Sequence, residues 1–127
     1  MSDRTTRGVR IAVAPQFHPE RSRPERREWF FSYTITIENH GEVPVQLVSR
    51  HWVITNGTGH QEHVRGPGVV GETPRLLPGQ AFTYTSFCPL DSPLGSMHGE
   101  FQMTLDDGET FDAIIDAFPL ADADSLN

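Results

Sequence analysis

The sequence contains no lysine, only one cysteine and no long apolar run. All ten of its cationic side chains are arginines. The single Cys88 cannot form an internal disulfide, which predicts a reducing, cytoplasmic location. No segment approaches the roughly 18 consecutive apolar residues of a membrane-spanning helix. The first residues also lack the apolar stretch of a signal peptide. We therefore expect neither membrane association nor secretion.

Positive charge is scarce in the second part of the chain. The net charge is −7, and residues 51–127 hold two arginines against eleven acidic residues. The phosphates of a nucleic acid would be repelled by a protein of this overall sign. The composition therefore argues against a nucleic-acid partner.

A helical period is also missing, because the apolar residues recur at every second position. The pattern is clearest in residues 29–38, where Phe31, Tyr33, Ile35 and Ile37 would share one face of a strand. Trp52 lies in a second apolar segment, and we expect it in the core. Further strands are predicted at 9–13, 43–49, 51–55, 82–87, 101–105 and 111–118.

Turn signals separate these segments. Asn56-Gly57, Pro78-Gly79 and Asp107-Gly108 are typical of tight turns between strands. Short strands joined by turns predict an all-β sandwich of about seven antiparallel strands, of the fibronectin type III or immunoglobulin-like class. One domain is expected over residues 1–127, with a core at about 7–120 and frayed ends.

A glycine motif is the first candidate binding site. Gly66, Gly68 and Gly71 match the pattern G-x-G-x-x-G, which binds pyrophosphate at a helix N-terminus in dinucleotide-binding folds. No βαβ pattern surrounds it here, so a tight loop with positive φ angles is the simpler interpretation. Backbone amides flanked by Arg65 and Arg75 could still bind an anion such as pyrophosphate.

Side chains suited to metal binding or catalysis form no recognisable set. His60 and His63 would point to opposite faces of a strand, and no spacing supplies a third ligand. Cys88 has no cationic neighbour in sequence that would lower its pKa. No G-x-S-x-G nucleophile motif occurs. We predict no metal site, no catalytic residue and no cofactor.

Several motifs taken together resemble the ApaG family. They are the segment 64–74 with its three glycines, Leu77-Pro78-Gly79, the segment 82–86, and Trp52 with Ile54. The similarity covers roughly residues 7–120. It implies a fibronectin type III-like sandwich in a bacterial protein linked to cobalt and magnesium homeostasis, without an established catalytic activity. It also implies that the glycine motif at Gly66, Gly68 and Gly71 could bind pyrophosphate.

Two functions follow from these observations. The first is a non-enzymatic binding module that recognises a protein partner through its loops or an exposed strand edge. The alternative is a phosphate-, pyrophosphate- or nucleotide-binding protein, with weak hydrolytic activity as a further option. Its site would be centred on the Gly66–Gly71 loop with Arg65 and Arg75. Polar groups converging near that loop would favour the alternative, and an open edge or apolar patch would favour the module.

Overall fold

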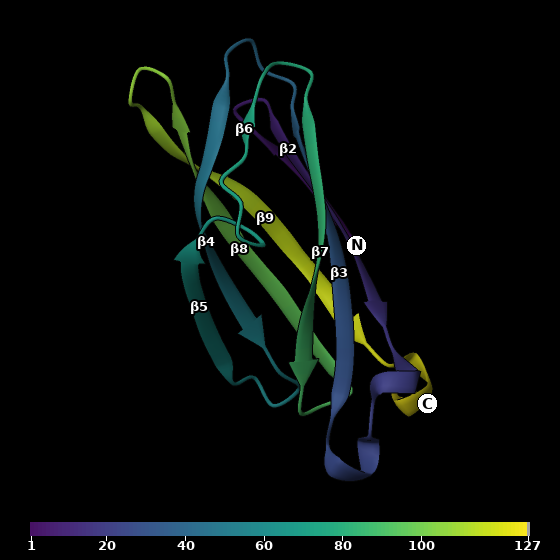
Figure 1. Ribbon diagram of the computed structural model, residues 1–127. Coiled ribbons are helices and arrows are strands. Elements are labelled where there is room, and N and C mark those ends of the chain that lie inside the picture. The colour runs from purple at the N-terminus through teal and green to yellow at the C-terminus, as the bar shows by residue number, and fades with distance from the viewer. Residues whose placement is uncertain (127) are drawn as a thin grey trace.

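Two antiparallel sheets pack face to face in the computed structural model, which describes residues 1–126 (Figure 1). The strand order of the first sheet is β1-β2-β3-β7, and that of the second is β5-β4-β8-β9, with β6 also paired to β4. The strands are β1 (Ser2–Thr6), β2 (Val9–Phe17), β3 (Trp29–Asn39), β4 (Val45–Thr55), β5 (Gln61–Pro67), β6 (Arg75–Leu76), β7 (Ala81–Leu90), β8 (Leu94–Leu105) and β9 (Thr110–Ala121). The 3₁₀ helices are η1 (Pro19–Arg21), η2 (Pro24–Arg26) and η3 (Ala123–Leu126). The predicted all-β sandwich is confirmed.

The core lies between the two sheets and is built from the alternating apolar positions. Ile35 and Ile37 of β3 are fully buried, as are Phe101 of β8 and Phe118 of β9. Trp52 of β4 is 3% exposed, which confirms its predicted place in the core. Its ring lies 6.2 Å from that of Phe101 and 6.0 Å from that of Phe118, both in its own sheet, and 5.4 Å from that of Tyr33 on β3, so an aromatic contact also joins the two sheets across the core.

The described residues form nine strands, whereas the sequence predicted about seven. Segments 43–49 and 51–55 are one continuous strand, β4. Strands β1, β5 and β6 were not predicted, because β6 has only two residues and the other two are polar edge strands without apolar alternation. Residues 2–6, expected at a frayed end, pair with β2 through a two-residue turn at Arg7 (φ 49°) and Gly8 (φ 83°).

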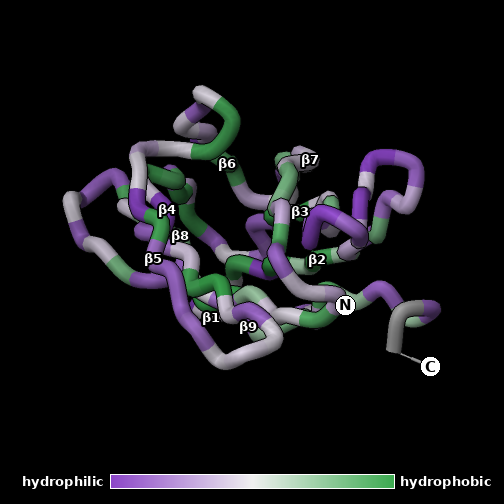
Figure 2. The backbone as a smooth tube through the Cα atoms, turned by 90° about the horizontal axis from the view of Figure 1, so that it is seen from below, coloured by the Kyte–Doolittle hydropathy of each residue, from purple (hydrophilic) through white to green (hydrophobic). Residues whose placement is uncertain are grey.

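The sandwich is closed along one side and open along the other. Strands β1 and β9 lie side by side, with an Arg4–Asp116 ion pair of 3.1 Å and a 3.2 Å bond donated by the Ile114 amide to Thr6 Oγ1. The terminal strands on the opposite side, β5 and β7, belong to different sheets and lie apart (Figure 2). This open side exposes part of the space between the sheets.

The predicted strands at 82–87 and 101–105 are both longer in the structure, so the connection between them is much shorter than the sequence indicated. Strand β7 continues to Leu90 and β8 starts at Leu94, so residues 91–93 alone connect them. Within residues 1–126 no helix has the length and apolar character needed to cross a bilayer.

Candidate functional site

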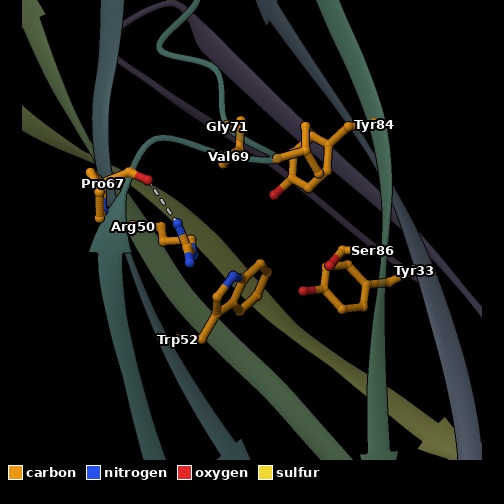
Figure 3. Close-up of a pocket in the computed structure, with 9 residues that line it drawn as sticks. Tyr33, Arg50, Trp52, Pro67, Val69, Gly71, Tyr84 and Ser86 are labelled. Carbon is orange, nitrogen blue, oxygen red and sulfur yellow. Dashed lines mark hydrogen bonds between the residues drawn. The ribbon is translucent and has the colours of Figure 1, made fainter.

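A cleft of about 370 Å³ opens between β5 and β7, on the open side of the sandwich. Strands β3 and β7 form one wall, and β4 forms the other. The glycine-rich segment after β5 closes the upper end (Figure 3). The cleft is lined by Tyr33, Arg50, Trp52, Pro67, Val69, Val70, Gly71, Tyr84 and Ser86.

A bulge in β4 places Arg50 in this cleft. Leu47 pairs with Met103 and Ser49 with Gln102, so Val48 is an extra residue in the strand. An extra residue reverses which side chains face inward beyond it. Arg50 therefore lies on the same face as Trp52, toward the space between the sheets, at a position where a core residue would otherwise stand.

The Arg50 guanidinium is held by the backbone of the glycine segment. Its Nη1 donates to the carbonyl oxygens of Pro67 and Gly68, both at 2.9 Å. A guanidinium has five N–H donors, and these two bonds use the donors of Nη1. No carboxylate within residues 1–126 forms an ion pair with Arg50. The charge is half-buried, and its Nε and Nη2 donors remain for another group.

Three hydroxyl groups face Arg50 and Trp52 from the opposite wall. They belong to Tyr33 of β3 and to Tyr84 and Ser86 of β7 (Figure 3). Burial raises the pKa of Tyr33, partly offset by its hydrogen bond with Ser86, and burial also raises the pKa of Tyr84. Both phenols therefore stay protonated near neutral pH and can donate hydrogen bonds to an anion.

Three backbone amides of the glycine segment, those of Gly68, Val69 and Glu72, donate hydrogen bonds within the fold. The Gly68 amide donates to Val48 O at 2.9 Å, and Val69 and Glu72 exchange two backbone hydrogen bonds of 2.8 Å. These amides are therefore already used within the fold. Between them, Val70 (φ 45°) and Gly71 (φ 79°) form a two-residue turn at the rim of the cleft. A left-handed conformation is strained for a β-branched residue such as Val70, and such strain often occurs at binding sites.

The two arginines predicted beside this motif lie outside the cleft. Arg75 forms a 2.6 Å ion pair with Asp106. Arg65 of β5 lies opposite His51 of β4 in the sheet register, and its side chain is exposed on the outer face of the second sheet. Of the predicted residues, Gly71 lines the cleft. Gly66 lies against the guanidinium of Arg50, because a Cβ atom on Gly66 would be 2.9 Å from Arg50 Nη2. Sequence reasoning missed Arg50, whose signal was a charged residue inside an apolar strand segment.

A histidine cluster lies on the outer face of the second sheet. His51 Nδ1 lies 2.6 Å from Glu100 Oε1, and His51 Nε2 lies 2.9 Å from His63 Nδ1. The histidine that pairs with His63 is thus His51 and not His60. Among the described residues, no group of three or more His, Cys, Asp or Glu side chains is arranged to hold a metal ion.

Cys88 is buried on the inner face of β7, and burial raises the pKa of its thiol to about 11. The native protein therefore holds this proton more tightly than the unfolded chain, whose thiol ionises near pH 8.5, about the usual value. The stability that Cys88 contributes is complete below that pH and declines as the pH rises from about 8.5 to 11. The matched variant Cys88→Ser should show a smaller decline over this range in urea unfolding.

The same burial predicts low reactivity. At pH 8 we expect a disulfide reagent to react with native Cys88 roughly 100-fold or more slowly than with the protein unfolded in urea. Equal rates in the two states would show that the thiol is accessible and ionised more easily than its surroundings indicate.

The comparisons with known proteins agree on one family. The ApaG domain model matches residues 19–105. Protein ApaG of Anaeromyxobacter dehalogenans is 53% identical over 127 residues, all of both chains, and Protein ApaG of Pseudomonas aeruginosa is 52% identical over 121 residues, 95% of each. The crystal structure of a putative ApaA protein from Bordetella pertussis has a TM-score of 0.87 and 43% identity, covering 89% of this chain and 92% of that one. The chain therefore belongs to the ApaG family.

Proposed function

We propose that this protein is a non-enzymatic recognition module that binds an anionic group in the cleft at Arg50. The observation that carries the proposal is the half-buried guanidinium of Arg50, which has no carboxylate partner among residues 1–126 and faces three hydroxyl groups. A partly buried charge is costly unless it is paired, and a guanidinium pairs best with a carboxylate or a phosphate. A bound anion would supply the missing partner.

The lining of the cleft supports a binding role rather than a catalytic one. The described residues that line it include no carboxylate and no imidazole. The two tyrosines have raised pKa values, so neither is suited to accept a proton at neutral pH. The names of the curated relatives are not those of enzymes.

Several expectations from the sequence are compatible with this proposal. A role in cobalt and magnesium homeostasis would act through the recognised anion or partner. The lone, buried Cys88 is consistent with a reducing cytoplasm. Pyrophosphate remains a candidate ligand, with Arg50 in place of Arg65 and Arg75.

The proposal predicts that Arg50→Gln weakens anion binding at least tenfold, about 1.4 kcal/mol. The probes are pyrophosphate, inorganic phosphate and glutarate, titrated while the indole N–H of Trp52 is followed by NMR. The matched controls are Arg65→Gln and Arg75→Gln, which remove the same charge outside the cleft and should leave the affinity nearly unchanged. Added salt should weaken the binding, as expected for recognition based on charge.

Gly66→Ala provides a second check, because its Cβ would displace the Arg50 guanidinium without changing the charge. We expect it to weaken the same titration. If none of the three anions moves the Trp52 signal, or if Arg50→Gln binds them as well as the native protein does, the proposal is wrong.

A further inference from the structure

Strand β7 presents an unprotected edge. It is the terminal strand of its sheet, and β3 is its one strand neighbour within residues 1–126. Its ten residues carry no charge, and its proline, Pro89, stands next to the end. Natural proteins usually protect such edges with charges, bulges or covering segments, because free N–H and C=O groups can pair with another strand. The edge of β7 is therefore ready to accept an extended segment.

The cleft lies directly beside this edge. Tyr84 and Ser86 line the cleft from β7, while the alternate residues Thr83, Thr85 and Phe87 are exposed on the outer face. Side chains directly opposite one another on paired strands point to the same face. A residue opposite Tyr84 or Ser86 on an added strand would thus point into the cleft, toward Arg50.

We propose that β7 accepts an extended segment of a partner protein, and that an acidic side chain of this segment enters the cleft and pairs with Arg50. The inference rests on the proposed function, because it assigns the anionic group to a glutamate or aspartate of the segment. Backbone hydrogen bonds to β7 supply affinity, and Arg50 with the hydroxyls of Tyr33 and Tyr84 supplies selectivity for the acid.

Charges near one end of β7 restrict the position of that acid. A second pocket beside Leu90, near the end of the strand, is lined by Glu62 and Asp91 among others. Two carboxylates repel a third, so the acid of the partner is disfavoured there and favoured at the level of Tyr84 and Ser86.

The outer face indicates what the neighbouring residue of the segment should be. Phe87 is 52% exposed, and its ring lies 5.4 Å from that of Phe30. The Arg21 guanidinium lies 4.0 Å from the centre of the Phe30 ring and 5.4 Å from that of Phe87. An aromatic or β-branched residue opposite Phe87 would extend this cluster.

A second copy of this chain does not fit the site as well. If β7 paired with β7 of another molecule, the uncharged residues of that strand would face Arg50 and leave it without a counter-ion. A free phosphate could satisfy Arg50 but would leave the strand edge unpaired. A segment that combines an extended backbone with one acid satisfies both features.

The test uses two pools of capped heptapeptides, with glutamate or glutamine fixed at the centre and valine, threonine or phenylalanine elsewhere. We expect the glutamate pool to bind at least tenfold more tightly and to shift the amide NMR signals of residues 81–90. In Arg50→Gln the two pools should bind equally. N-methylation along one backbone edge of the peptides should weaken binding at least tenfold, whereas methylation of the other edge should have little effect.

Pyrophosphate and glutarate are titrated in parallel to separate the two proposals. Binding of these anions at Arg50 without binding of the peptides would overturn the inference and leave the proposed function intact. Equal binding of the two pools to the native protein, shifts at β1 or β5 instead of β7, or a dimer formed through β7 at NMR concentrations would also overturn it. Failure of all anions and peptides would overturn both.

Discussion

Gly68→Ala is expected to lower the free energy of unfolding by about 3 kcal/mol or more, because two independent costs coincide at this position. The φ angle of Gly68 is +57°, in the left-handed region that favours glycine. A Cβ atom would also lie 2.2 Å from the carbonyl oxygen of Glu72. That oxygen accepts a 2.8 Å hydrogen bond from Val69, so it cannot move away without breaking the turn.

Gly71→Ala is the matched control within the same motif. Gly71 also has a positive φ, +79°, but no atom lies within 4 Å of the position that its Cβ would take. It should therefore cost only about 1 kcal/mol, from the backbone conformation alone. Denaturant unfolding followed by tryptophan fluorescence measures both variants. Equal losses would contradict the close approach of Gly68 to Glu72.

Phe118→Ala should be the other strongly destabilising change, at about 3–5 kcal/mol. Phe118 is 1% exposed, and its ring lies 6.0 Å from those of Tyr33 and Trp52, one in each sheet. Alanine would leave a cavity between the sheets and remove the ring contacts with Tyr33 and Trp52, two of the three aromatic residues that line the cleft. The measurement is again denaturant unfolding, with the m-value used to check that the transition remains two-state.

The control for this variant is Phe87→Ala, which removes the same side chain from the outer face of the first sheet. Phe87 is 52% exposed, so its loss should cost at most about 1 kcal/mol. A loss below about 1 kcal/mol for Phe118→Ala would mean that the two sheets do not pack around this ring as described.

The sequence predicted the strands that contribute alternating residues to the core. In β3, Phe31, Tyr33, Ile35 and Ile37 are all buried, because burial on one face is what produces the period of two. The edge strands β1 and β5 escaped prediction because they bury little apolar surface. Their pairing depends on backbone hydrogen bonds, which leave no such pattern in the side chains.

The candidate site was less predictable, because its residues come from segments far apart in the sequence and because a bulge in β4 changes which side chains face inward. The glycine motif lies in the segment beside the cleft, and its role in binding stays a prediction. Arg50 faces the cleft only because Val48 is an extra residue in β4, and a bulge of this kind has no distinctive sequence. Tyr33 and Tyr84 look like ordinary core residues until the opposite wall is known. For the same reason, Arg65 and Arg75 are close to the motif in sequence and yet stand outside the cleft.

Because the cleft lies on the open side of the sandwich, a group bound in it would affect the stability of the whole domain. Along one border, contacts between strands β1 and β9 join the two sheets. At the opposite border, a group bound in the cleft would contact β3 and β7 of the first sheet and β4 of the second. The bound group would thereby cross-link the two sheets, because the sheets could not separate until it was released. Occupancy would then raise the free energy of unfolding, and with it the resistance to proteolysis, by an amount that grows with the ratio of ligand concentration to Kd.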